Sequence, residues 1–101
     1  MMHFIVFASD AANSGDLRLA HRQEHVDYWK RQGDTVLVAG AMMSGDDEDA
    51  VPVGSSFLLA AANEDAVKRL MADDPFTLRG VFGLPLQIQR VRPAIGTLWP
   101  Q

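Results

Sequence analysis

The order of apolar segments in this sequence predicts an α+β fold of the ferredoxin-like class, a β-α-β-β-α-β sandwich with one antiparallel sheet. Three observations support that prediction. Four short runs are rich in β-branched and aromatic residues, as strands are. Two longer segments, one after the first run and one after the third, repeat apolar residues at helical spacing. The length of 101 residues suits a single domain, residues 1–101, with a modest core.

The first strand is expected at residues 3–8, which read HFIVFA. Because both of its faces are apolar, this strand belongs in the middle of a sheet that is covered on both sides. The first helix is expected at residues 17–32, with Asp16 as its N-cap and Gly33 in the left-handed C-cap position.

The next two strands and the second helix follow the same kind of pattern. A strand is expected at residues 35–40, an exposed loop with four acids at 42–53, and another strand at 55–61. Asn63 then caps the second helix. Its inward-facing residues are expected to be Ala66, Val67, Leu70 and Met71.

The second helix must stop near Asp74, because Pro75 disfavours helical geometry in the residue before it. Residues 75–84 are expected to form a short turn or helix. The last strand is expected at residues 86–92, LQIQRVR.

A ferredoxin-like sheet carries both helices on one face and leaves the other face bare. Strands that are apolar on both sides imply that a second subunit covers the bare face and closes a barrel-like interior. The sequence therefore predicts a homodimer. The tail at residues 94–101 also needs a surface to cover, because it holds Leu98 and Trp99.

Charge and composition argue against several functional classes. The formal net charge is -4, so nucleic acid and membrane are not expected as partners. The absence of cysteine excludes disulfides, Cys-ligated zinc and a thiol nucleophile. His21 and His25 lack a third ligand at a suitable spacing, so neither a metal site nor another cofactor is expected. The N-terminus has no basic leader and no spanning apolar run, which makes the cytoplasm the default location.

One stripe of the first helix carries charge where packing should place hydrocarbon. At about 100° per residue, Arg18, Arg22, His25 and Trp29 share a narrow line in the middle of the inward face. An unpaired charge in apolar surroundings costs roughly several kcal/mol. These side chains therefore need carboxylate partners, water or a bound anion.

Four segments in order, LRLAHRQEHVDYW, VLVAGAM, VGSSFLLAA and DDPFTLRGVF, resemble the YCII family of small dimeric α+β proteins. The resemblance runs from residue 3 to about residue 93. In that family an Arg-x-x-His motif on a helix faces an Asp-Pro-aromatic motif after the second helix, and the motif histidine and aspartate are taken as the active site. Here these motifs fall at Arg22 with His25 and at residues 74–76, and the family's Gly-Ser falls at residues 54–55.

The chain departs from the family pattern after the second strand. The family often reads Ala-Gly-Pro there, whereas this chain has Ala39, Gly40 and Ala41. The missing proline bears on the shape of that pocket wall and hence on substrate choice. A few relatives resemble dehydrochlorinases or isomerases of hydroxylated aromatic rings, which is what the resemblance implies about chemistry.

His25 and Asp74 are the candidate catalytic pair. An imidazole exchanges protons near neutral pH, and a neighbouring carboxylate would orient it as a general base or acid. Each residue also has a structural interpretation. His25 can be a buried histidine that is hydrogen-bonded for stability, and Asp74 can cap a short helix that Pro75 begins. A carboxylate has two oxygens and can serve in both roles.

Arg22 and Arg18 are candidates for binding a substrate carboxylate or phenolate, which the planar guanidinium suits. The alternative for either arginine is an internal ion pair with Asp74 or Asp10. Ser55 can donate a hydrogen bond into the same cleft, or be only a turn residue at the start of its strand.

Two functions from different classes follow. The first is a small dimeric enzyme in which His25 and Asp74 transfer a proton on a small anionic or phenolic compound held by Arg22, by elimination, isomerisation or hydrolysis. The second is a non-catalytic module whose cleft holds a metabolite or supports another protein.

Overall fold

A four-stranded antiparallel sheet with the order β2-β3-β1-β4 forms the centre of the molecule. The computed structural model describes residues 1–99. The strands are β1 (Met2–Ser9), β2 (Val36–Met43), β3 (Pro52–Ala61) and β4 (Gln87–Val91). This order, with a helix after β1 and after β3, is that of a ferredoxin-like α+β fold, which confirms the predicted fold class.

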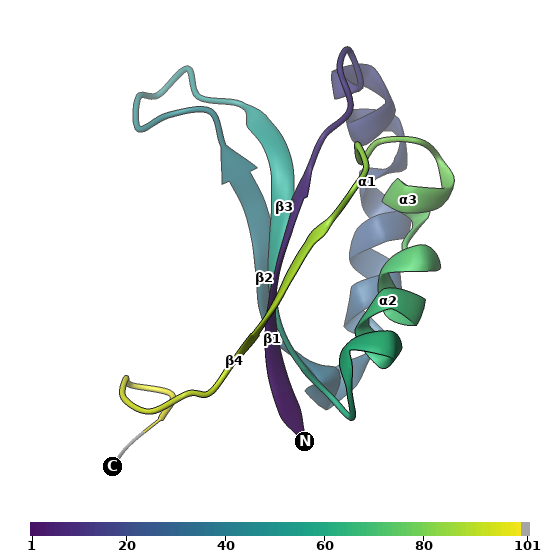
Figure 1. Cartoon of the computed structure of the whole chain (residues 1–101). Coiled ribbons are helices and arrows are strands. Elements are labelled where there is room, and N and C mark those ends of the chain that lie inside the picture. Colours follow the sequence, from purple (N-terminus) through teal and green to yellow (C-terminus); the bar gives the residue numbers. More distant parts are fainter. Residues whose placement is uncertain (100–101) are drawn as a thin grey trace.

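The helices all lie on one face of the sheet (Figure 1). They are α1 (Gly15–Lys30), α2 (Glu64–Ala72) and the short α3 (Pro75–Leu78), and a 3-10 turn, η1 (Gly33–Thr35), leads into β2. None of the helices within residues 1–99 is both long and apolar enough to cross a membrane.

The core lies between the sheet and the helices. Phe4 and Val6 of β1 pair with Leu59 and Phe57 of β3, so alternate residues of both strands point toward the helices. Burial on this face is nearly complete, and the helices contribute further large side chains to it. The other core residues include Trp29, Val67, Met71, Phe76 and Phe82.

The start of α1 differs from the prediction that Asp16 is its N-cap. The helix begins at Gly15, and Ser14 occupies the N-cap position without a side-chain capping bond. The Ser14 hydroxyl instead donates to the carbonyl oxygen of Ala11, at 2.7 Å, which fixes the preceding turn. Asp16 lies in the first helical turn, where a carboxylate still favours the helix dipole.

The β2–β3 hairpin is longer than predicted. Met43 still pairs with Pro52, and the amide of Ser44 donates to the carbonyl of Val51 at 2.8 Å, so the loop is confined to residues 44–51. Thr35 belongs to η1 rather than to a strand. Gly33 does adopt a left-handed φ of 58°, but it opens η1, and the C-cap residue of α1 is Arg31.

The face of the sheet opposite the helices is apolar and largely open. Phe7 and Val38 expose 46% and 56% of their surfaces there, and Ile5 and Leu58 are half-buried. The segment after β4 passes on this side (Figure 1), where the Trp99 ring packs edge-on against His3 at 4.9 Å. The predicted tail therefore finds a surface in part, and its last two residues lie outside the described residues.

Candidate active site

Helix α1 places the charged stripe beside the sheet as predicted, with one exception. Arg18 and Trp29 are buried, and the His25 side chain is only 13% exposed. Arg22 is exposed, so it is wrong to place it in the packed interior. Its long side chain lines the mouth of a cavity instead, which keeps the guanidinium in water.

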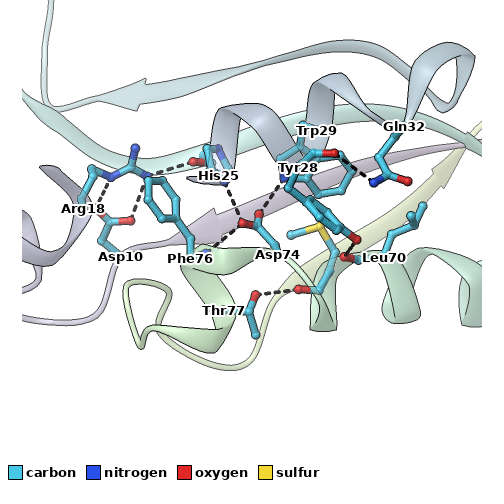
Figure 2. A network of polar contacts seen from close by, with 12 residues as sticks. Asp10, Arg18, His25, Tyr28, Trp29, Gln32, Leu70, Asp74, Phe76 and Thr77 are labelled. Carbon is cyan, nitrogen blue, oxygen red and sulfur yellow. Dashed lines mark hydrogen bonds and ion pairs between the residues drawn. The ribbon is translucent and has the colours of Figure 1, made fainter. Parts of the chain in front are cut away.

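Asp74 lies between α2 and α3 and is fully buried. Its Oδ1 accepts hydrogen bonds from His25 Nδ1 at 2.8 Å and from the backbone N–H of Phe76 at 2.9 Å (Figure 2). Its Oδ2 accepts a hydrogen bond from Trp29 Nε1 at 2.7 Å. Both interpretations of Asp74 are therefore realised together: the carboxylate pairs with the histidine and also caps α3. With three donors engaged, it is fixed in place.

The histidine ring is held in one orientation. Because a carboxylate only accepts hydrogen bonds, Nδ1 of His25 donates to Asp74 and the lone pair of neutral imidazole lies on Nε2. The ring stacks on Phe76, with centroids 3.9 Å apart and planes within 8°. Within residues 1–99, every buried side-chain nitrogen has a hydrogen-bond partner. Nε2 of His25 has no partner in the described residues, so it is not fully buried. Because His25 lines the cavity, Nε2 is accessible from there.

A second buried network lies about two helical turns before His25, around Arg18 of α1. Arg18 Nε and Nη2 donate to the two carboxylate oxygens of Asp10 at 2.7 and 3.0 Å, and Nη2 also donates to Ser55 Oγ at 2.9 Å. The guanidinium lies over the Phe76 ring at 4.7 Å. Of the two partners expected for Arg18, Asp10 is the one present.

Ser55 is positioned by this network as a donor. A guanidinium has no acceptor, so Ser55 Oγ must accept from Arg18, and its own proton remains to be donated elsewhere. The side chain is buried but lines the cavity. A neighbouring cation strengthens such a hydroxyl donor toward an oxygen of a ligand.

A cavity of about 400 Å³ lies between α1 and the β2–β3 pair. This volume lies within the range of small-molecule sites. Its wall includes Ala39, Gly40 and Ala41, the segment in which the proline of the related pattern is missing. The cavity brings together His25, Arg22, Arg18 and Ser55, with Asp74 directly behind the imidazole.

The residues that line this cavity include cations and no acids. They are Arg18, Arg22, His25, Val26, Trp29, Lys30, Gly33, Val36, Ala39, Gly40, Ala41 and Ser55. Within the described part of the chain, Arg22 and Lys30 form no ion pair, whereas Arg18 is neutralised by Asp10. The sequence reasoning missed Lys30, because on an ideal helix it falls on the solvent side and only its long side chain reaches the groove.

The remaining histidines lie outside the cavity. His21 is on the surface, where its hydrogen bond to Glu24 lowers the pKa of that carboxyl group, with Arg79 contributing in the same direction. His3 contacts the tail on the other face of the sheet. Across residues 1–99 no three metal-ligating side chains come together.

Fold and site together define a class of protein: a ferredoxin-like α+β domain with a His–Asp pair beneath a cavity between its first helix and edge strand β2. The chain belongs to the YCII-related domain family, whose model matches residues 2–85. It is 33% identical over 86 residues to an uncharacterized protein of Haemophilus influenzae, a match that covers 80% of this chain and 88% of that protein.

Solved structures with the same fold include enzymes. The 5-chloro-2-hydroxyhydroquinone dehydrochlorinase TftG of Burkholderia phenoliruptrix AC1100, in complex with 2,5-dihydroxybenzoquinone, superposes with a TM-score of 0.81 at 24% identity, covering 92% of this chain and 96% of that one. An antibiotic biosynthesis monooxygenase reaches a TM-score of 0.50 at 15% identity, covering 94% and 100%. At these identities the likeness establishes the fold.

Proposed function

We propose that this protein is a small enzyme in which His25 transfers a proton to and from a phenolic or other anionic compound bound beside α1. The observation that carries this proposal is the hydrogen bond from His25 Nδ1 to buried Asp74, which leaves Nε2 as a base facing the cavity. A positioned base of this kind contributes roughly 10²–10⁴ in rate.

Each neighbouring residue has a distinct part in that chemistry. Asp74 is a positioning residue, since all its hydrogen bonds go to protein groups, and its charge stabilises the imidazolium that forms when His25 takes a proton. Arg22 is free to pair with a phenolate or carboxylate, and the Ser55 hydroxyl donates to a substrate oxygen. Arg18 holds Ser55 in that orientation.

The substrate class rests on the shape of the cavity and on the likeness to TftG, whose substrate is a chlorinated, hydroxylated ring and whose structure holds a dihydroxybenzoquinone. In an elimination, His25 Nε2 takes a proton from the substrate, the electron pair left behind expels chloride, and the proton later leaves to water. Isomerisation uses the same base to remove a proton and return it at another atom. Hydrolysis uses it to activate water.

The open face of the sheet is proposed to be the interface of a homodimer. Phe7 and Val38 expose much of their surface beside half-buried Ile5 and Leu58, and together they form an apolar patch on the strands. A second copy of the same face covers it by two-fold symmetry, so both partners bury the same residues.

The test is a turnover assay of the purified protein against chlorinated and hydroxylated aromatic compounds, beginning with 5-chloro-2-hydroxyhydroquinone. The release of chloride measures turnover. His25→Gln and Asp74→Asn are expected to lower kcat at least about 100-fold while circular dichroism shows the wild-type fold. His21→Gln is the matched control and should keep full activity, because His21 is on the surface.

Retained activity in both site variants would refute the His–Asp pair as the proton-transfer device. Binding of ring compounds without any turnover would instead favour the second function, a metabolite-binding module.

A further inference from the structure

We propose that Lys30 forms a second anion site at the far end of the cavity, and that the ligand is an elongated hydroxylated acid with its charge remote from the reacting oxygen. This inference rests on the proposed function of the His25 site and names its substrate class more closely.

The cavity follows α1 for most of its length. Its wall includes Arg18 near the start of the helix and Lys30 at its end, a separation of about 18 Å at about 1.5 Å per residue. His25 lies between them, and the five residues from His25 to Lys30 place the Cα atom of Lys30 about 8 Å further along the helix axis than that of His25. Gly33 and Val36, which follow Lys30 in the sequence, also line the cavity. A group bound at Lys30 is therefore separate from the group that reacts at His25.

The charges at the two ends differ. At the Arg18 end, Asp10 takes up the positive charge through two short hydrogen bonds. At the Lys30 end no acid lines the wall, and within residues 1–99 the ammonium group has no ion-pair partner. A carboxylate is the ligand group that complements this end.

A lysine in the last turn of a helix also complements the helix dipole, which is the structural alternative for Lys30. Arg31 supplies the same kind of charge at the same helix end, yet it does not line the cavity. Arg31 is therefore a matched control that separates the dipole effect from ligand binding.

The ligand class follows from the spacing. Because His25 and Lys30 are about 8 Å apart along the helix axis, a phenolic oxygen at His25 and a carboxylate at Lys30 belong to a hydroxylated aromatic acid whose carboxylate stands on a short side chain. Such a molecule fits a cavity of about 400 Å³. 4-Hydroxycinnamate has this form, and 4-hydroxycinnamamide is its neutral counterpart of the same shape.

The experiment measures equilibrium binding of these two probes by calorimetry or by NMR titration, at low and at high salt. Wild-type protein should bind the carboxylate about threefold to fivefold more tightly than the amide, because Lys30 is exposed and an exposed ion pair contributes that much. Salt should reduce the difference. Lys30→Gln should remove the preference and Lys30→Glu should reverse it. Arg31→Gln should keep it.

The proposal is overturned if wild-type protein shows no preference for the carboxylate, if the preference survives in Lys30→Gln, or if neither probe binds at millimolar concentration. His25→Gln is expected to keep the preference although its turnover is lost. Failure of the remote site and failure of the proton-transfer proposal therefore appear in different measurements.

Discussion

Asp74 shows how one side chain serves the fold and the site at once. Its buried charge is compensated by three donated hydrogen bonds, from an imidazole, an indole and a backbone amide. An asparagine there presents only one acceptor oxygen, so it must leave at least one donor unpaired, at a cost of about 1–3 kcal/mol. This is why the Asp74→Asn turnover assay is paired with a check of the fold.

Tyr28 gives a test of stability against pH at the same scale. Its hydroxyl donates to the carbonyl oxygen of Leu70 at 2.6 Å, and burial raises its pKa, with the charges of Asp73 and Asp74 acting in the same direction. Folding therefore favours the neutral phenol. That stabilisation is complete below the pKa of the unfolded chain and is lost as the pH rises through the higher pKa of the folded protein.

We therefore expect the urea midpoint of the wild type to fall more steeply than that of Tyr28→Phe as the pH rises above about 10. At neutral pH the variant should be about 1 kcal/mol less stable, because the bond to Leu70 is lost. Parallel slopes for the two proteins in alkaline solution would contradict this account.

The residues of the site were predictable only to a limited extent. Two features of the site can be derived from local patterns. Helical spacing brings His25 and Arg18 to one face of α1, and an aspartate directly before a proline predicts that Asp74 caps a helix. The hydrogen bond from Trp29 Nε1 to Asp74 joins residues 45 positions apart, and Asp10 was one of two carboxylates expected for Arg18. No local pattern specifies which buried donor meets which carboxylate.

At the scale of elements, Gly54 is where β3 packs most tightly against the neighbouring residues of β1 and β2. It pairs with Ser9 of β1 and with Met42 of β2, immediately before Ser55. A Cβ added at Gly54 would lie 2.7 Å from the carbonyl oxygen of Ala8 and would also meet the end of the Met42 side chain. The backbone oxygen cannot move without breaking the ladder.

Gly54→Ala is therefore expected to lower the free energy of unfolding by about 1–3 kcal/mol, as overpacking does. Urea denaturation measures this change. Gly45→Ala is the control, because a Cβ there meets nothing within 4 Å, and it should stay within about 0.5 kcal/mol of the wild type. Equal stability of the two variants would show that β3 can shift to relieve the contact.

The element boundaries show where local sequence signals compete. Asp16 and Ser14 are both good N-cap residues, and the choice of Ser14 as the helix boundary depends on its bond to the Ala11 carbonyl in the folded loop. The hairpin extends to Met43 and Pro52 because pairing satisfies backbone groups that an open loop would leave to water. The first outcome depends on a hydrogen bond within the loop and the second on pairing between two strands.

At the scale of the whole molecule, the two faces of the sheet have different environments. One face is covered by α1, α2 and α3, as the element order predicted (Figure 1). The other face holds Phe7 and Val38 with much of their surface exposed. The sequence predicted that both faces of the strands are apolar. What covers the second face depends on how the protein assembles, which a single chain does not specify.

The homodimer proposal gives a direct prediction for that face. Phe7→Glu places a charge in the apolar patch, and the single interface of a two-fold dimer receives that charge from both subunits. Wild-type protein should sediment as a dimer at micromolar concentration and the variant as a monomer. Leu78→Glu is the matched control, because Leu78 is 67% exposed on α3, on the opposite side of the molecule, and it should remain dimeric. A wild-type monomer at that concentration, or a Phe7→Glu dimer as stable as the wild type, would mean that a second copy of this face is not what covers the sheet.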